Sequence, residues 1–384
     1  MTSPNKLAQI VVCATVILVM STGLAFTGGQ AEGEEEEGIP EEIRIGWVPP
    51  DITGVFATAT EYFERSAEDA REAGIDVEID TQSPATHVDF GEQVDIIDDL
   101  VARNIDAIAI SPTEVEVVIP ALQAANDAGI PLVIVNLLEP IEGVEAASYV
   151  GFSNVDAGRV SGYALLDFLG GPGVLGEGET VDYEGFLDLE FWEDLYADVS
   201  PADVDISGRV AIIEGIAGGH FSERRLEGFH EVIDPFEDIE VVTTLPADWN
   251  REKAVDVTED ILEAHDNLDA IWAASNEMGI GAQTVLEREG VDDQIKVITN
   301  DGTPESVDMI REGRLVAETW HGFPEWGWYG TRFAVMAVLG LEDQIPQQFD
   351  IRPRIVYEGN TDEFYPNVEL EEHDWDSIIE AAQE

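Results

Sequence analysis

Short apolar runs alternate with amphipathic segments along most of this chain. Four early runs have the length and composition of buried strands: Ile43–Val48, Asp76–Asp80, Ala107–Ile110 and Leu132–Val135. The segments between them, at about 57–73, 88–103 and 114–128, repeat apolar residues with helical spacing. Two of these segments end just before a glycine, Gly74 and Gly129, as helices often do. Repeated strand–helix units of this length predict a parallel sheet covered by helices.

A second series of the same kind follows Tyr149-Val150-Gly151. Helices are expected at 155–169, 219–233, 250–265 and 277–289, and strands at 210–213, 239–243, 269–274 and 295–299. A strand at 315–319, an apolar helix begun near Pro324, a strand within 350–357 and a short helix after Asp374 complete the pattern. Residues 170–205 have no clear period, and we interpret them as an insertion whose aromatic residues pack onto the second series. The predicted fold class is therefore α/β with two parallel-sheet lobes.

The first residues have the pattern of a targeting segment. Lys6 is the one charged residue before an apolar run from about Ile10 to Met20, and small residues follow as far as Ala31. Residues 1–31 are therefore interpreted as a signal peptide, with an uncleaved membrane anchor as the alternative. Residues 32–42 are acidic and aperiodic, which is typical of a disordered linker. The single cysteine, Cys13, lies inside the apolar run, so the processed chain would form no disulfide.

The charge of the chain excludes some classes of binding partner. It has 81 acidic and 18 basic residues, and the formal net charge is −63. Such a chain repels nucleic acid and anionic membranes. The acidic residues are spread along the helices, which favours a solvated, salt-adapted surface of the halophilic kind. Calcium sites are the alternative, but no loop of the Asp-x-Asp-x-Asp-Gly type supports them.

Polar residues gather where two neighbouring strands end. Ser275, Asn276 and Glu277 follow the strand at 269–274, and Asn300 and Asp301 follow the strand at 295–299. In an open α/β sheet, ligands bind at the carboxyl ends of the strands. The chain pairs no nucleophile with a base and has no cluster with metal-ligand spacing, so we expect a binding protein, with neither catalytic residues nor a cofactor or metal.

A set of short motifs resembles the ribose/galactose-type periplasmic binding proteins of ABC transporters, whose fold is shared by lac-repressor-like regulators. The motifs, in family order, are Ala107-Ile-Ala-Ile-Ser-Pro112, Ala128-Gly-Ile-Pro-Leu-Val133, Tyr149-Val-Gly-Phe-Ser-Asn154, Glu227-Gly-Phe229, Ala247-Asp-Trp-Asn-Arg251, Ser275-Asn-Glu-Met278 and Asn300-Asp-Gly-Thr-Pro304. The resemblance covers about residues 43–357. It implies two Rossmann-like lobes joined by three crossovers, comprising residues 43–152 with 322–352 and residues 153–321 with 353–384. A regulator would need a DNA-binding motif at its N-terminus, where this chain has a signal-like segment.

The resemblance also implies a set of residues for the site. Asp301 corresponds to a ligand-binding aspartate, with a helix cap as the alternative role. Ser275 and Asn276 stand where the family usually has asparagine and aspartate, and a helix cap is the alternative role for Asn276. Trp249 corresponds to an aromatic residue that stacks on the ligand, and the alternative is a core position. Phe56 and Asp51 lie in the first strand–helix loop, where family members place aromatics against the sugar; the alternative for Phe56 is also the core.

Several positions depart from the family pattern. Asn136 and Leu137 replace an aspartate–arginine pair that grips the sugar. Either Arg224 or Arg225 is expected to supply the family's arginine, unless both form surface ion pairs. His321 matches a crossover position that often contacts the ligand, with a structural role as the alternative. These departures argue against ribose and favour another neutral sugar, a deoxysugar or a polyol.

The resulting hypothesis is a monomeric, secreted binding protein, periplasmic or extracellular, that closes on its ligand and delivers it to an ABC permease. A sensory protein that reports to a chemoreceptor or kinase is the alternative, because it would use the same pocket. No interaction with nucleic acid is expected.

Overall fold

The structure is a computed structural model that describes residues 39–175, 185–366, 368 and 370–384. The predicted signal peptide (1–31) and most of the predicted linker (32–42) lie outside these residues. The described strands are β1 (Ile43–Val48), β2 (Val77–Thr81), β3 (Ala107–Ile110), β4 (Leu132–Val135), β5 (Ser148–Gly151), β6 (Gly208–Glu214), β7 (Ile239–Pro246), β8 (Ala270–Ala273), β9 (Lys296–Asp301), β10 (Ala317–Trp320), β11 (Gln348–Asp350) and β12 (Arg354–Tyr357).

Four helices of the first half lie close to the ranges expected from the periodicity: α1 (Gly54–Ala73), α2 (Phe90–Ala102), α3 (Val115–Asp127) and α4 (Asn154–Phe168). A fifth, α5 (Leu189–Tyr196), lies in the interval 170–205, where no helix was expected. Those of the second half are α6 (His220–Ile233), α7 (Arg251–Ala264), α8 (Asn276–Glu289), α9 (Pro304–Arg311), α10 (Phe323–Val338), α11 (Thr361–Phe364) and α12 (Trp375–Ala382), with a 3₁₀ turn at Glu342–Gln344. Among the described helices, none combines the length and apolar character that crossing a membrane requires.

The strands form two sheets with equivalent strand orders. The first has the order β11-β5-β4-β3-β1-β2 and the second the order β12-β10-β9-β8-β6-β7. All pairs are parallel except β10 with β12, which is antiparallel. We call the parts built on these sheets the first lobe and the second lobe. The prediction of two parallel-sheet α/β lobes is confirmed, with β12 as the antiparallel edge strand.

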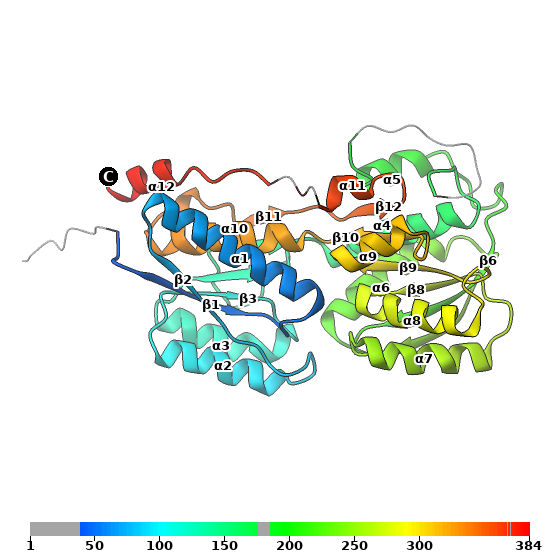
Figure 1. Ribbon diagram of the computed structural model, residues 1–384, viewed down its shortest axis with the longest axis horizontal. Coiled ribbons are helices and arrows are strands. Elements are labelled where there is room, and N and C mark those ends of the chain that lie inside the picture. The colour runs from blue at the N-terminus through cyan, green and yellow to red at the C-terminus, as the bar shows by residue number, and fades with distance from the viewer. Residues whose placement is uncertain (1–38, 176–184, 367, 369) are drawn as a thin grey trace, which may run out of the picture. The chain divides into compact units, whose positions relative to one another are not determined.

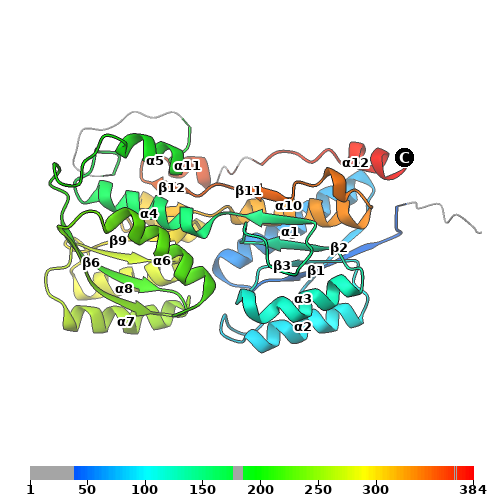
Figure 2. The same cartoon turned by 180° about the vertical axis from the view of Figure 1, so that it is seen from behind.

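Helices cover both faces of each sheet. In the first lobe, α1 packs against α10 on one face and α2 against α3 on the other, as Figure 1 shows. In the second lobe, α4 pairs with α6 and α7 with α8, and Figure 2 shows these helices from behind. Strands buried on both faces are apolar throughout, as in Ala107–Ile110 and Ala270–Ala273. Each lobe therefore has its own core.

Among these elements the chain passes between the lobes three times, from β5 to α4, from β10 to α10 and from β11 to β12. The C-terminal segment differs from its expected place, because the range 353–384 is divided between the lobes. β12 and α11 pack on the second lobe, whereas Trp375 of α12 is buried in the first-lobe core and donates a hydrogen bond of 2.8 Å to Asp69 of α1. The C-terminal segment thus passes between the lobes a fourth time, and the buried Trp375 with its distant partner Asp69 stabilises this passage.

The described part of the interval 170–205 packs on the second lobe. Its helix α5 lies against α4, and the side chains of Trp192 and Tyr196 belong to the second-lobe core. Phe186 is 48% exposed, with the guanidinium of Arg354 over its ring at 4.6 Å. Partly buried Phe191 packs against the same core, so three of the aromatics attach the segment to its host. Residues 176–184 lie outside the described part.

Candidate functional site

A cavity of about 130 Å³ lies where the carboxyl ends of strands from both lobes meet. The first lobe contributes loops that follow β1, β2, β3 and β4, together with the first turn of α10. The second lobe contributes loops after β7, β8 and β9, and α6. Eight of the ten residues predicted for the site line this cavity: Asp51, Phe56, Asn136, Arg225, Trp249, Ser275, Asn276 and Asp301.

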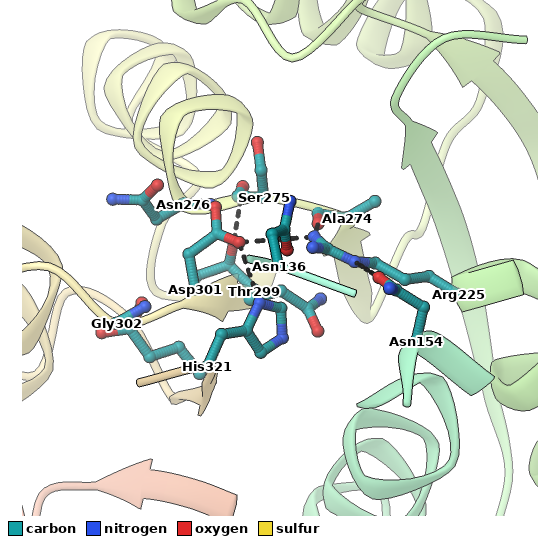
Figure 3. A network of polar contacts seen from close by, with 12 residues as sticks. Asn136, Asn154, Arg225, Ala274, Ser275, Asn276, Thr299, Asp301, Gly302 and His321 are labelled. Atoms are coloured by element: carbon teal, nitrogen blue, oxygen red, sulfur yellow. Dashed lines mark hydrogen bonds and ion pairs between the residues drawn. The ribbon is translucent and has the colours of Figure 1, made fainter. Parts of the chain in front are cut away.

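The second-lobe wall is polar and is organised around a buried ion pair. Arg225 of α6 is 4% exposed, and its Nη1 lies 3.3 Å from Oδ1 of Asp301 at the end of β9. The same Nη1 donates to the carbonyl of Ala274 at 2.6 Å, and Nε donates to Oδ1 of Asn154 at 2.9 Å (Figure 3). The backbone N–H of Asn276 donates to Oδ2 of Asp301 at 3.1 Å. A buried charge pair with this many hydrogen bonds holds both side chains in one arrangement.

The position of Arg225 follows from the helical repeat of α6. The buried residues of this helix include Phe221, Ser222, Arg225, Gly228 and Phe229, which recur three or four positions apart. Arg224 falls outside this face and pairs instead with Glu227 at 2.6 Å on the surface. Of the two arginines considered from the sequence, the structure thus places Arg225 at the cavity and Arg224 away from it.

Three cavity residues have a backbone conformation that is uncommon for residues with side chains. The φ angles are 65° for Asn136, 59° for Trp249 and 109° for Asp301. Such conformations cost of order 1–3 kcal/mol each and concentrate at functional sites. The next residue, Gly302, has a φ of 92°, and a Cβ there would lie 2.4 Å from the ring of Trp320. The loop that presents Asp301 therefore requires glycine at 302.

The first-lobe wall is largely aromatic. The ring of Phe56 lies 6.2 Å from those of Phe323 and Trp326, and the latter two are 4.1 Å apart. Trp249 approaches from the second lobe, with its ring 5.3 Å from the guanidinium of Arg225. Phe323 and Trp326 were not predicted for the site, although both stand in the aromatic stretch that follows the strand at 315–319. The cavity thus places flat apolar surfaces opposite hydrogen-bonding groups.

The other charged groups of the cavity wall are paired within the protein. Nε2 of His87 lies 3.1 Å from Oδ2 of Asp51. Burial alone would raise the pKa of Asp51, but its interactions with His87 and Thr53 lower it overall. Glu277 makes two contacts with Arg251, at 2.8 and 2.9 Å. With Arg225 bound to Asp301 and Glu277 to Arg251, each charged side chain of the described cavity lining contacts a polar or charged side chain within the protein.

Two amide side chains of the wall carry oxygen atoms that are buried without a hydrogen-bond partner among the described residues. They are Oδ1 of Asn136 and Oδ1 of Asn276. The Nδ2 group of Asn136 donates to Ser111 at 3.3 Å, and that of Asn276 donates to Thr303 at 2.7 Å. Buried acceptors are nearly always paired in folded proteins, so these two oxygens are candidates to receive hydroxyl protons from a ligand.

The helices at the cavity have their own capping residues. Ser275 caps α8 by accepting from the N–H of Met278, and Thr303 caps α9 in a capping box with Ser306. Asp301 and Asn276 are therefore not the side chains that cap these helices, which was the alternative role for each. Ser275 lines the cavity while serving as a cap.

His321 lies behind the wall instead of lining the cavity. Its side chain is fully buried, with Nδ1 3.2 Å from Oδ1 of Asp301 and the ring stacked on Phe152 at 4.1 Å. Burial lowers the pKa of His321 to about 4, the nearby Arg225 adds to this effect, and Asp301 opposes it. A neutral imidazole at this place supports Asp301 from the rear.

The lobes also touch each other beside the cavity. Phe221 of α6, a second-lobe residue, is buried in an apolar cluster of the first lobe. Oε2 of Glu114, in the first lobe, accepts a hydrogen bond of 3.1 Å from the backbone N–H of His220 at the start of α6. These contacts define a closed arrangement of the two lobes around the cavity.

No group of three or more histidine, cysteine, aspartate or glutamate residues with the geometry of a metal site occurs in residues 39–175, 185–366, 368 and 370–384. Of the lining residues that were not predicted for the site, His87 lies in the loop after β2, and Glu277 and Asn250 neighbour predicted site residues. For Glu277 and Asn250, this neighbourhood was the available signal.

Comparisons with known proteins agree with this geometry. The D-allose-binding periplasmic protein of Escherichia coli (strain K12) is 28% identical over 258 residues, which span 65% of this chain and 70% of that protein. The ribose import binding protein RbsB of Bacillus subtilis (strain 168) is 25% identical over 307 residues, or 80% of this chain and 85% of that protein.

Solved structures show the same fold. An ABC transporter periplasmic solute binding protein from Actinobacillus succinogenes 130z with bound D-allose has a TM-score of 0.69 and 22% identity, and covers 84% of this chain and 100% of its own. A solute binding protein from Bacillus halodurans C-125 with bound myo-inositol has a TM-score of 0.65. Residues 45–342 match the family model described as periplasmic binding protein domain, which is most of the chain, and the protein therefore belongs to this family.

Proposed function

We propose that this protein is the extracytoplasmic solute-binding component of an ABC importer and that it binds a neutral sugar or polyol between its lobes. The observation that carries the proposal is the cavity itself. It combines an aromatic wall with a polar wall, and its charged side chains are already paired within the protein.

The chemistry of the walls favours a neutral ligand with several hydroxyl groups. Asp301 and the two free amide oxygens accept hydrogen bonds, whereas Phe56, Phe323, Trp326 and Trp249 offer flat surfaces to the C–H faces of a ring. An anionic ligand would meet Asp51, Glu277 and Asp301 with no spare cation in the described wall. The relatives named for D-allose and ribose support the same ligand class.

Binding would proceed by hinge closure. The chain segments that cross between the lobes would act as the hinge, and the ligand would bridge the walls of the open form before they close. The contacts of Phe221 and Glu114 would then stabilise the closed form, which the permease would recognise. The protein would act by binding alone, as a secreted monomer in the periplasm or outside the cell.

A thermal-shift screen in molar salt tests the ligand class. Neutral aldoses, deoxysugars and polyols form one panel, and sugar acids and amino acids form the control panel. At least one neutral compound should raise the melting temperature in a concentration-dependent way, because a ligand that binds only the folded state stabilises it. Stabilisation confined to the control panel, or by no compound, would contradict the proposal.

A further inference from the structure

A fully buried carboxyl group lies behind the polar wall of the cavity. Glu318 is in the middle of β10, has an exposed fraction of 0%, and does not line the cavity. A glutamate in an apolar strand of the sequence Ala317-Glu318-Thr319-Trp320 is costly unless its oxygens are hydrogen-bonded. Both oxygens have partners. Oε2 accepts from the backbone N–H of Gly302 at 3.1 Å, and Oε1 accepts from Oγ of Ser306 at 2.8 Å.

These two bonds connect Glu318 to the two ligand-facing residues, Asp301 of β9 and Asn276 of α8. Gly302 directly follows Asp301, so the bond to its N–H fixes the turn in which Asp301 adopts its φ of 109°. Oγ of Ser306 lies 2.9 Å from Oγ1 of Thr303, and this Oγ1 accepts a hydrogen bond of 2.7 Å from Nδ2 of Asn276. Since the N–H of Asn276 donates to Asp301, the contacts form a closed ring behind the cavity.

The ring fixes the orientation of the Asn276 amide. Because Nδ2 is directed to Thr303, Oδ1 is left as the free acceptor of that side chain. Burial raises the pKa of the Glu318 carboxyl well above its ordinary value, the hydrogen bond from Ser306 partly offsets this, and the Asp301 carboxylate adds to it. A neutral carboxyl adds no second negative charge behind the Asp301 carboxylate. In that form the proton on Oε1 donates to Oγ of Ser306 across the same 2.8 Å contact, and Oγ donates to the carbonyl of Thr303 at 3.1 Å.

We propose that Glu318 is a positioning residue that closes this ring and thereby holds Asp301 and Asn276 in the geometry that binds the ligand. The inference rests on the proposed function, because its consequence is a change in affinity. Buried networks in which each member is satisfied restrict side chains to one arrangement, and binding sites depend on such support. Glu318 touches the ligand-facing residues only through the ring.

The test compares four variants in calorimetric titrations with D-allose, D-ribose and myo-inositol in molar salt. Glu318→Leu removes the ring at nearly constant volume, and Glu318→Gln keeps a neutral hydrogen-bonding group of the same shape. Ser306→Ala removes one link and keeps the bond to Gly302. Ile261→Ala is the matched control, because Ile261 is a buried core residue of α7 in the same lobe that makes no contact in the ring.

We expect Glu318→Leu to raise the Kd of the sugar bound by the wild type by about 10-fold or more, and Ser306→Ala by roughly 3-fold or more, since each removes hydrogen bonds that order the site. Glu318→Gln should stay within about 3-fold of the wild type, and Ile261→Ala should be less stable without a change in Kd. If Glu318→Leu does not fold, Ser306→Ala carries the test.

The inference is overturned if Glu318→Leu binds like the wild type, if Glu318→Gln is as weak as Glu318→Leu, or if Ile261→Ala loses as much affinity as the ring variants. With Ser306→Ala as the remaining variant, wild-type affinity would overturn it. A wild type that binds none of the three probes, nor any other neutral compound of the screen, would instead refute the proposed function.

Discussion

The ion pair between Arg225 and Asp301 should contribute both to the stability of the fold and to ligand affinity. Mutations can separate these two contributions. At the observed separation of 3.3 Å, an effective dielectric constant of 20 gives an attraction of about 5 kcal/mol between unit charges. Both side chains are more than nine-tenths buried, so removing one partner leaves the other charge without its counter-ion. Measured costs for breaking buried pairs are about 3–5 kcal/mol.

Three variants test this reasoning. Arg225→Met preserves the length of the side chain, and Asp301→Asn tolerates the positive φ while keeping an acceptor for the N–H of Asn276. Each single variant should lose about 3–5 kcal/mol in urea unfolding. The double variant has no unpaired charge and should come within roughly 2 kcal/mol of the wild type. Its affinity for sugar should nevertheless fall by at least about 10-fold, because hydrogen bonds to charged groups contribute roughly 1.5–3 kcal/mol.

Additive stability losses, in which the losses of the two single variants simply sum in the double variant, would show that the two charges do not interact in the folded protein. If the double variant is stable and also binds with wild-type affinity, the pair has a structural role and the ligand is bound elsewhere.

Three further outcomes are expected. Trp249→Ala should weaken sugar binding by about 1–3 kcal/mol through loss of a stacking surface, as measured by calorimetry; an unchanged Kd would mean that the aromatic ring lies outside the ligand contacts. The pKa of His321 is lowered by burial to about 4, so the unfolded chain binds the extra proton first and stability falls as pH decreases from 6.5 to 4. The unfolding free energy should fall by roughly 3 kcal/mol over this pH range. The His321→Gln variant should show a correspondingly shallower pH dependence in urea unfolding, and identical profiles would exclude His321 as the cause. The melting temperature should rise with potassium chloride up to molar concentrations because the net charge is −63, and a salt-independent value would refute an adaptation to salt.

Much of the fold follows from local signals. The strands are continuous apolar runs and the helices have amphipathic spacing, and both patterns are set by which faces are buried. The C-terminal helix α12 was expected after Asp374, which does cap it, but its attachment to the first lobe was not. An eight-residue helix carries no information about a partner some 300 residues away, such as Asp69.

The lining of the candidate cavity was predictable where the family pattern and the strand ends coincide, as at Asp301 and Asn276, and Trp249 was indicated by the family pattern alone. The choice between Arg224 and Arg225 was available from the sequence as well, because Arg225 is in phase with the buried face of its helix. The place of Phe323 and Trp326 in the cavity wall could not be predicted, since an aromatic residue in a first helical turn is equally suited to a core. Glu318 could have been noticed in the sequence, because it is a carboxylate inside an apolar strand.

The most direct test of the account is calorimetric titration of the purified protein, in molar salt, with the neutral compound that stabilises it most in the thermal-shift screen. We expect one site per chain, a Kd in the micromolar range or tighter, and a negative heat-capacity change as the aromatic wall is covered. The Arg225→Met/Asp301→Asn variant should bind at least about 10-fold more weakly. Binding of no neutral sugar or polyol at micromolar affinity, or equal binding by that variant, would contradict it.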